Sequence, residues 1–130
     1  MTILNDKQIT ARCERDDILI PMIVPFESKS VRLVDVEGSN ARKVLSFGTS
    51  SFGYDVRLRR DQVQIFTNVN GGVLDPKRPN PQTMADAKVM VDEDGAEYFL
   101  LPPNSYALAA TIEEFHIPRD VTVLCVGKST

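Results

Sequence analysis

The stretch IPRDVTVLCVGKST, residues 117–130, sets the fold that we expect of this chain. After the turn at Pro118, apolar residues fill most positions from Val121 to Val126, so both faces of an extended segment would be apolar. Such a run predicts a strand that is covered on both faces. A glycine and three polar residues follow at 127–130. A buried strand that delivers polar groups to its tip usually continues into more structure, so we expect the sequence to stop in the middle of a site.

The polar tip has two interpretations. Lys128, Ser129 and Thr130 bring an ammonium group and two hydroxyls directly after Gly127, and these groups with backbone N–H donors are what a phosphate needs. An ordinary polar turn after a strand has the same composition, and the pattern alone leaves both open. A P-loop fits poorly, because Walker A requires a glycine where this chain has Thr122.

Composition limits the class of protein. A length of 130 residues suits one domain with a modest core. The net charge of −3 gives no general attraction to nucleic acid or to a membrane surface. No apolar run approaches the length that crosses a bilayer, and the first residues lack the features of a signal peptide. We therefore expect a cytoplasmic protein with neither nucleic acid nor membrane as a partner.

Metal-binding residues are scarce. Cys13 and Cys125 lie far apart in sequence, His116 is the single histidine, and there is no Cys-x-x-Cys pair. Two separated thiols indicate reduced cysteines in a reducing compartment. One histidine and two distant cysteines cannot supply a closed zinc site, so we expect no bound metal.

The remaining pattern predicts one helix and many short strands. Asn5 and Gln8 have capping-box spacing before a helix that we expect to end near Arg15 or Asp16. Gly and Pro turns separate the short extended runs that follow, which predicts a mainly β barrel or sandwich. The expected runs are 18–20, 31–36, 43–46, 62–66, 106–111 and a hairpin of 88–91 with 97–101 around the turn at 92–95.

Residues 47–58 form the densest polar cluster. Asp55 and Arg57 are two positions apart and would share one face of a strand. They could form a structural ion pair at a sheet edge, or they could line a polar pocket or a subunit contact. The sequence leaves these alternatives open.

Four stretches taken together resemble a known family. They are SSFGYDVR at 50–57, VLDPK at 73–77, LPPNSYAL at 101–108, and IPRD at 117–120 continuing to GKST at 127–130. In order and spacing they resemble the N-terminal two-thirds of a bacterial dCTP deaminase, within the dUTPase-like superfamily. The resemblance implies a mainly β fold, a distorted β-barrel of the dUTPase-like type with an N-terminal helix. It also implies that residues 1–130 form a single, incomplete domain.

The resemblance also implies an activity. Family members hydrolyse the C4 amino group of dCTP, which gives dUTP and ammonia in pyrimidine deoxynucleotide (dUTP and dTTP) biosynthesis. They are homotrimers with active sites built between subunits, and Mg²⁺ is carried by the triphosphate. No zinc is used, which agrees with the absence of the His-x-Glu and Pro-Cys-x-x-Cys motifs of the zinc deaminases.

Site residues follow from the same resemblance. Lys128, Ser129 and Thr130 would open the nucleotide-binding segment, with Ser129 supporting catalysis. The family's catalytic arginine and glutamate would lie beyond Thr130, so we expect no catalytic residue within the chain and no deamination by residues 1–130 alone. The role of His116 stays open, because the family more often has arginine there.

Several other carboxylates lie near these motifs, and other functions fit the same residues. Asp55 is expected to pair with Arg57 and Asp120 with Arg119, which leaves both ionised and poor proton shuttles. Neither these nor the remaining carboxylates near the motifs, Asp75, Glu113 and Glu114, are expected to be catalytic. The alternatives to a dCTP deaminase are a dUTPase, a bifunctional dCTP deaminase–dUTPase, and a non-catalytic nucleotide-binding or interaction protein.

Overall fold

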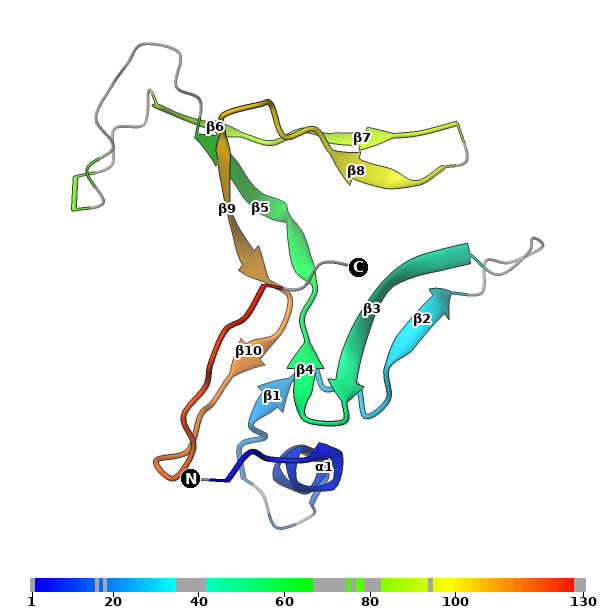
Figure 1. Ribbon diagram of the computed structural model, residues 1–130, viewed down its shortest axis with the longest axis vertical. Coiled ribbons are helices and arrows are strands. Elements are labelled where there is room, and N and C mark those ends of the chain that lie inside the picture. Colours follow the sequence, from blue (N-terminus) through cyan, green and yellow to red (C-terminus); the bar gives the residue numbers. More distant parts are fainter. Residues whose placement is uncertain are drawn as a thin grey trace. The chain divides into compact units, whose positions relative to one another are not determined.

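The computed structural model describes residues 2–15, 17, 19–34, 42–66, 75, 77–78, 83–93 and 95–127 (Figure 1). The chain divides into two compact units. Unit 1 consists of Met1–Arg57 and Ile112–Thr130, and unit 2 is the continuous stretch Leu58–Thr111. The single domain expected over residues 1–130 stays a prediction.

Helix α1, Asp6–Glu14, begins where the capping box was expected. The Asn5 side chain accepts from the Gln8 N–H at 2.9 Å, and the Gln8 side chain accepts from the Asn5 N–H at 3.0 Å. These two bonds satisfy donors that a helix start otherwise leaves without partners. Ile9 and Cys13, one turn apart, are the buried residues of the helix.

The core of unit 1 forms where α1 meets the next segment. Ile9 and Cys13 pack with Met22 and Ile23, and Leu4, Phe26 and Tyr54 cover the edges of this cluster. Burial raises the pKa of the Cys13 thiol above its ordinary value. Ile23 belongs to the short strand β1, Ile23–Val24, which pairs antiparallel with β10, Glu114–Phe115.

A second sheet of unit 1 has the order β2–β3–β4, from strands Val31–Val34, Arg42–Ser50 and Gly53–Asp55. Its tight β3–β4 hairpin pairs Gly48 with Asp55 and Ser50 with Gly53. The segment before β2 is fastened to this hairpin. The Thr49 N–H and hydroxyl both donate to the Glu27 carbonyl, at 3.0 and 2.8 Å, and the Glu27 N–H donates to the Tyr54 hydroxyl at 3.1 Å.

Unit 2 contains a three-stranded sheet of order β6–β5–β9, from Met84–Asp86, Leu58–Phe66 and Tyr106–Thr111. In Figure 1 the orange strand β9 runs beside the green strand β5. Val63 and Ile65 are buried on one face opposite Ala109 and Ala107. The other face exposes Tyr106 and Leu108, at 78% and 57%.

The expected hairpin in unit 2 is confirmed. Strand β7, Val89–Val91, pairs antiparallel with β8, Glu97–Phe99. The turn is closed by the Gly95 N–H, which donates to the Asp92 carbonyl at 3.0 Å, and Gly95 has a φ of 77°. Arg60 of β5 forms an ion pair with Glu97 of β8.

The mainly β class with one N-terminal helix is confirmed, and several expected strands lie where the pattern placed them. Two expectations were wrong. Leu19 and Ile20 form a bend, exposed at 94% and 58%, and not an extended run. The covered strand expected at 121–126 is also absent: no described segment pairs with it, and Leu124 and Val126 are 79% and 80% exposed. An alternating apolar pattern indicates strand propensity, but a strand also requires a hydrogen-bonded neighbour.

Candidate functional site

The densest polar contacts of unit 1 meet at Arg57, just after β4. Its Nε donates to Glu113 Oε1 at 2.7 Å, and its backbone N–H donates to Glu113 Oε2 at 2.9 Å. The Arg57 carbonyl in turn accepts from the Ile112 N–H at 2.8 Å. The guanidinium carbon lies 4.5 Å from the centre of the Phe47 ring, a distance at which the cation is attracted to the aromatic face. Arg57 is thus fixed by an anion, an aromatic ring and its own backbone.

Glu113 is the acid of this arrangement. Its side chain is 0% exposed, whereas that of Arg57 is 31% exposed. A buried carboxylate is tolerated only when it is paired and hydrogen-bonded, and both of its oxygens are bonded to Arg57. The expected partner of Arg57 was Asp55, so this part of the prediction was wrong. Strand β4 ends at Asp55, and the same-face rule does not extend past a strand end.

Asp55 itself lies half-buried on the β3–β4 hairpin. Its Oδ2 accepts from the Ser46 hydroxyl at 3.1 Å. Ser46 lies two residues before Gly48, the cross-strand partner of Asp55, so the two side chains share one face of the sheet. This contact links the two strands of the β3–β4 hairpin. It supports a structural role for Asp55 and not a place in the wall of a pocket.

The segment that leads toward the predicted nucleotide-binding tip begins beside Arg57. We call residues 112–121 the C-terminal strap. Its backbone is bonded to the N-terminal part of unit 1 through the β1–β10 pairing and through the His116 N–H, which donates to the Met22 carbonyl at 2.8 Å. The His116 side chain is exposed, and its role stays open.

An ion pair to α1 lies near the other end of the strap. Arg12 Nη2 lies 2.7 Å from Asp120 Oδ2, and Nη1 lies 3.4 Å from Oδ1. The Arg12 guanidinium lowers the pKa of the Asp120 carboxyl below its ordinary value. The expected partner was Arg119, which was wrong: residues 119 and 120 lie in a turn closed by the Val121 N–H and the Pro118 carbonyl, and Asp120 pairs with the Arg12 side chain of α1.

The predicted site residues Lys128, Ser129 and Thr130 lie outside the described residues. Up to Gly127 the chain after the strap is exposed, and Cys125 carries an exposed thiol. The structure therefore describes the chain up to Gly127, and the assignment of nucleotide binding to residues 128–130 stays a prediction. The expected covered strand would have enclosed Cys125, and the exposed segment does not.

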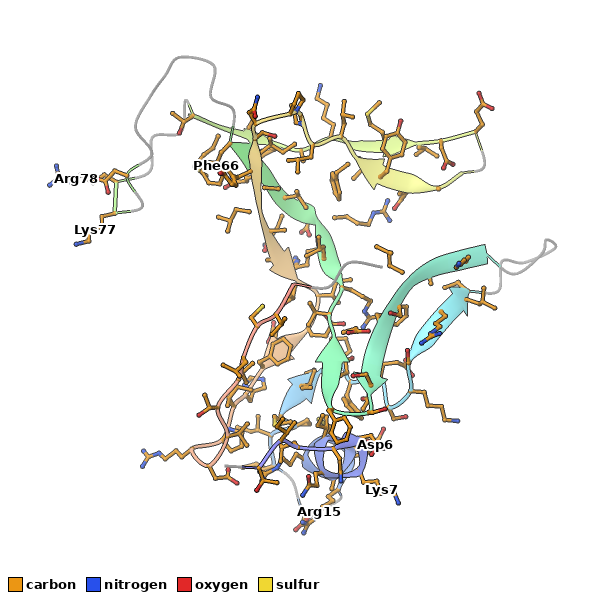
Figure 2. All side chains as sticks on the ribbon, in the orientation of Figure 1. Asp6, Lys7, Arg15, Phe66, Lys77 and Arg78 are labelled. Atoms are coloured by element: carbon orange, nitrogen blue, oxygen red, sulfur yellow. The ribbon has the colours of Figure 1, made fainter. Side chains whose placement is uncertain are left out.

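The other carboxylates near the motifs lie on the surface. Asp75 accepts from the Lys77 N–H at 2.9 Å, which closes a turn, and Figure 2 shows the side chains of Lys77 and Arg78 extending outward from it. Glu114 is exposed within β10.

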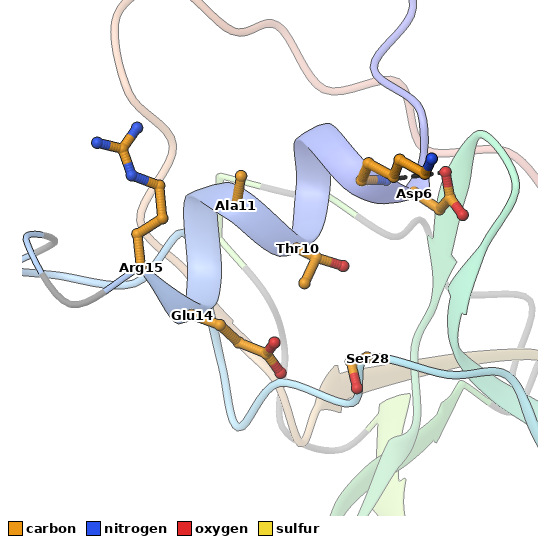
Figure 3. Close-up of a pocket in the computed structure, with 7 residues that line it drawn as sticks. Asp6, Thr10, Ala11, Glu14, Arg15 and Ser28 are labelled. Atoms are coloured by element: carbon orange, nitrogen blue, oxygen red, sulfur yellow. Dashed lines mark hydrogen bonds between the residues drawn. The ribbon is translucent and has the colours of Figure 1, made fainter.

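A shallow cavity of about 370 Å³ lies along α1 (Figure 3). It contains none of the predicted site residues, and it mixes charges of both signs. Arg15 on its rim is paired with Asp17, with Nη2 and Oδ2 2.5 Å apart. The side chains that line it include Asp6, Lys7, Thr10, Glu14, Arg15 and Ser28. Shallow, mixed-charge surface of this kind gives no basis for a ligand.

The structure also bears on metal binding and on membrane insertion. Within the described ranges, no group of three or more His, Cys, Asp or Glu side chains is placed so that it could hold a metal ion. The expected absence of zinc nevertheless stays a prediction. None of the helices in the part of the chain that the structure describes is long and apolar enough to cross a membrane.

Sequence reasoning missed Glu113 and Arg12. Glu113 stands beside a second glutamate, and nothing in the local pattern tells which of the two is buried. Arg12 lies on a helix 108 positions before its partner, and only the folded contact reveals the pair. Asp55, by contrast, was found because the polar stretch from Phe47 to Leu58 is dense.

The chain has a mainly β architecture, a capped first helix and a motif-bearing β3–β4 hairpin, and comparison with known proteins shows its family. The model of a dCTP deaminase-like family matches residues 3–130. The chain therefore belongs to the dCTP deaminase-like family. It is 43% identical over all 130 residues to a protein named dCTP deaminase from Francisella tularensis subsp. novicida, and equally to one of that name from Francisella philomiragia. The chain spans 60% of the length of these curated relatives.

Proposed function

We propose that the complete gene product containing this chain deaminates dCTP hydrolytically, with dUTP and ammonia as products. The observation that carries this proposal is the family match over residues 3–130, with relatives named dCTP deaminase that are 43% identical across the whole chain. In this reaction the oxygen of water forms a bond to C4 of cytosine. The bond from C4 to the exocyclic nitrogen then breaks, and that nitrogen leaves as ammonia after gaining a proton.

The nucleotide would be held by Lys128, Ser129 and Thr130. The Lys128 ammonium is suited to a phosphate, the two hydroxyls can donate to phosphate oxygens, and Gly127 permits close backbone approach. Mg²⁺ would arrive on the triphosphate as part of the substrate. Ser129 would in addition support catalysis at the cytosine end of the nucleotide.

Water activation requires a base and a proton donor. Two carboxylates of unit 1, Glu113 and Asp120, are already bound to arginines. Their oxygens already accept hydrogen bonds from arginine N–H groups, so neither carboxylate is positioned to take a proton from water. We therefore place the general base outside residues 1–130, and we expect that residues 1–130 alone do not deaminate dCTP.

Assembly is part of the proposal. The structure exposes large apolar side chains on many strands, for example Leu45 at 77% and Tyr106 at 78%. Exposed apolar patches mark surfaces that other chains cover. We propose a homotrimer in the cytoplasm, with active sites between subunits, and static light scattering of the complete protein at micromolar concentration tests it. A monomer there would contradict the assembly.

Ammonia release from dCTP with Mg²⁺ tests the activity. The complete protein should release ammonia, and Lys128→Ala and Ser129→Ala should each lower kcat/KM by about tenfold or more, the loss typical of a charge-assisted contact. Lys88→Ala is the matched control, because Lys88 is an exposed lysine outside the proposed site.

The same assay, run in parallel with dUTP as the substrate, separates the alternatives. Pyrophosphate from dUTP with no ammonia from dCTP would identify a dUTPase, and ammonia together with pyrophosphate from dCTP would identify a bifunctional enzyme. Nucleotide binding without either product would identify a non-catalytic homologue. Robust ammonia release by residues 1–130 alone would contradict the proposal that the general base lies outside these residues.

A further inference from the structure

We infer that Asn104 is a site of spontaneous deamidation, at which the chain converts its own asparagine into aspartate and isoaspartate with water as the co-reactant. Asn104 is exposed in the turn at residues 102–105 of unit 2, between β8 and β9. The reaction belongs to the chain itself and does not depend on the proposed function.

The backbone of this turn has an uncommon conformation at Asn104. Its φ is 57°, and among the residues that the structure describes it is the only non-glycine residue with a positive φ. Asparagine adopts this left-handed conformation more readily than most residues, and it does so in turns. Pro102 and Pro103 restrict the chain before it, and the Ser105 hydroxyl donates to the Pro102 carbonyl after it. Both sides of the turn are thus fixed around an exposed asparagine.

The side-chain amide of Asn104 is not held in place. An asparagine amide offers two N–H donors and one carbonyl acceptor. Within the described ranges the structure gives no hydrogen bond to any of these groups of Asn104. The carbonyl carbon Cγ can therefore rotate toward the main chain without breaking a contact.

The nucleophile of the reaction is the backbone nitrogen of Ser105. Pairing of β9 with β5 begins one residue later, where Tyr106 is the partner of Phe66. In the described part of the chain the Ser105 N–H has no hydrogen bond to a carbonyl. Serine also has no branch at Cβ that would crowd this nitrogen. The attacking atom is consequently unprotected, as the amide is.

Deamidation then proceeds in two balanced steps. The Ser105 nitrogen forms a bond to Cγ of Asn104 and loses its proton, while the bond from Cγ to Nδ2 breaks and Nδ2 leaves as ammonia. Water opens the resulting five-membered imide ring. Cleavage of the new bond gives aspartate, whereas cleavage of the original peptide bond between Asn104 and Ser105 gives isoaspartate.

Asn5 is the internal control, because its amide and the nitrogen that follows it are both bonded. Its Oδ1 accepts from the Gln8 N–H at 2.9 Å, and the Asp6 N–H donates to the Ser51 carbonyl at 3.1 Å. Both bonds must open before a ring can close at Asn5. The loss of a helix cap and of a backbone hydrogen bond slows ring closure by about tenfold or more relative to Asn104.

The two products should differ in their effect on β9. Isoaspartate adds a carbon atom to the main chain just before the strand, where the Tyr106–Phe66 pair sets the register. Aspartate keeps the normal chain and, like asparagine, tolerates the left-handed conformation. Only the isoaspartate product should therefore disturb the start of β9.

The complete gene product, kept folded at mildly alkaline pH and physiological temperature, provides the test. Peptide mapping by mass spectrometry measures deamidation at each asparagine, and methylation by an isoaspartate methyltransferase reports the isoaspartate. Asn104 should react about tenfold or more faster than Asn5, and in urea the two rates should converge because the bonds at Asn5 are lost. Asn40, Asn68, Asn70 and Asn80 lie outside the described residues, and peptide mapping reports them separately.

Two results of this comparison would overturn the assignment. One is an Asn104 rate in the folded protein that is no higher than that of Asn5. The other is a tenfold difference that persists in urea, because the local sequence and not the fold would then set it. Neither measurement requires a variant.

Asn104→Gly is the matched variant for the effect on β9, because glycine accepts a positive φ and has no amide to lose. After ageing, the isoaspartate fraction of the unaltered protein should show faster hydrogen exchange in β9 than fresh protein. Aged Asn104→Gly and fresh Asn104→Asp should both keep the exchange rates of fresh protein. An equal loss of β9 protection in aged Asn104→Gly would show that ageing acts elsewhere and would contradict the effect assigned to Asn104.

Discussion

Gly48 and Lys29 touch at backbone level. A Cβ added at Gly48 would lie 2.3 Å from the Lys29 carbonyl oxygen, and Gly48 has a φ of 94°. Both the contact and the dihedral require glycine at this point of β3. The close approach is what allows Thr49 to bond to the Glu27 carbonyl.

Gly48→Ala should therefore destabilise the protein. The methyl group would push the 27–29 segment off the β3–β4 hairpin, and alanine is strained at a positive φ. We expect a loss of about 1–3 kcal/mol in the free energy of unfolding, measured by urea denaturation. Gly95→Ala is the matched control, because Gly95 has a positive φ of 77° but an added Cβ meets nothing within 4 Å. An equal loss in both variants would show that the dihedral, and not the Lys29 contact, sets the cost.

Glu113→Gln should lower stability by more than any exposed carboxylate change. The amide keeps the shape of the side chain but leaves the Arg57 charge without its buried partner. We expect a loss on the order of 2–4 kcal/mol in the free energy of unfolding. Glu114→Gln, the exposed neighbour, should stay within about 0.5 kcal/mol. Similar losses for the two variants would contradict the structural role of the buried pair.

Tyr54→Phe tests a single hydrogen bond. The Tyr54 ring stacks on Phe26 with centroids 5.8 Å apart, and phenylalanine preserves this contact. The hydroxyl that accepts from the Glu27 N–H is lost, which leaves a half-buried donor without its partner. We expect about 1 kcal/mol of destabilisation by thermal and urea unfolding. A variant as stable as the unaltered protein would mean that water replaces the hydroxyl at no cost.

The Arg12–Asp120 pair should be sensitive to acid. Because Arg12 lowers the pKa of Asp120 in the folded state, the carboxylate stabilises the fold at pH values above the unfolded pKa of roughly 4. This contribution is lost as the pH falls below that value, through the folded pKa. The difference in urea midpoint between the unaltered protein and Asp120→Asn should be constant from about pH 5 to 7 and should shrink as the pH falls below about 4 and through the folded pKa. A difference that grows on acidification would contradict the assignment.

The two thiols should react at different rates. Cys13 is buried and its pKa is raised by that burial, whereas Cys125 is exposed on the segment after the strap. A thiolate is the reactive form, so Cys125 should be labelled by a disulfide reagent within minutes at pH 8 and Cys13 only on unfolding. Cys125→Ser, which should abolish the fast phase, is the control. Equal labelling rates in residues 1–130 would contradict the burial of Cys13. In the complete protein, slow labelling of Cys125 would show that another chain segment covers it.

Local signals predicted the elements that are determined locally. The capping box at Asn5 and Gln8 predicted the start of α1, and the turn at Asp92–Gly95 predicted the β7–β8 hairpin, because both depend on residues within one turn of each other. The polar stretch at Phe47–Leu58 was recognised as a cluster for the same reason.

Contacts between distant residues could not be predicted in this way. The partners of Arg57 and Asp120 were assigned to sequence neighbours, and the structure instead joins Arg57 to Glu113 and Asp120 to Arg12. An ion pair across 56 or 108 positions is set by the course of the backbone, which no local pattern contains. The covered strand at Val121–Val126 was wrong because its apolar pattern gives a tendency, whereas pairing depends on which other segment lies beside it.

Unit 1 is made of two separate stretches of the chain, so its parts leave the ribosome at different times. Unit 2 is one continuous stretch, Leu58–Thr111, whereas unit 1 joins residues 1–57 to residues from 112 onward. A ribosome therefore delivers every residue of unit 2 before it delivers Glu113 or the β10 strand. Arg57 lacks Glu113, and β1 lacks β10, for the time in which the residues of unit 2 are added, about 3–11 s at about 5–20 residues per second. We expect the nascent N-terminal half of unit 1 to be the part of this chain that most needs a chaperone.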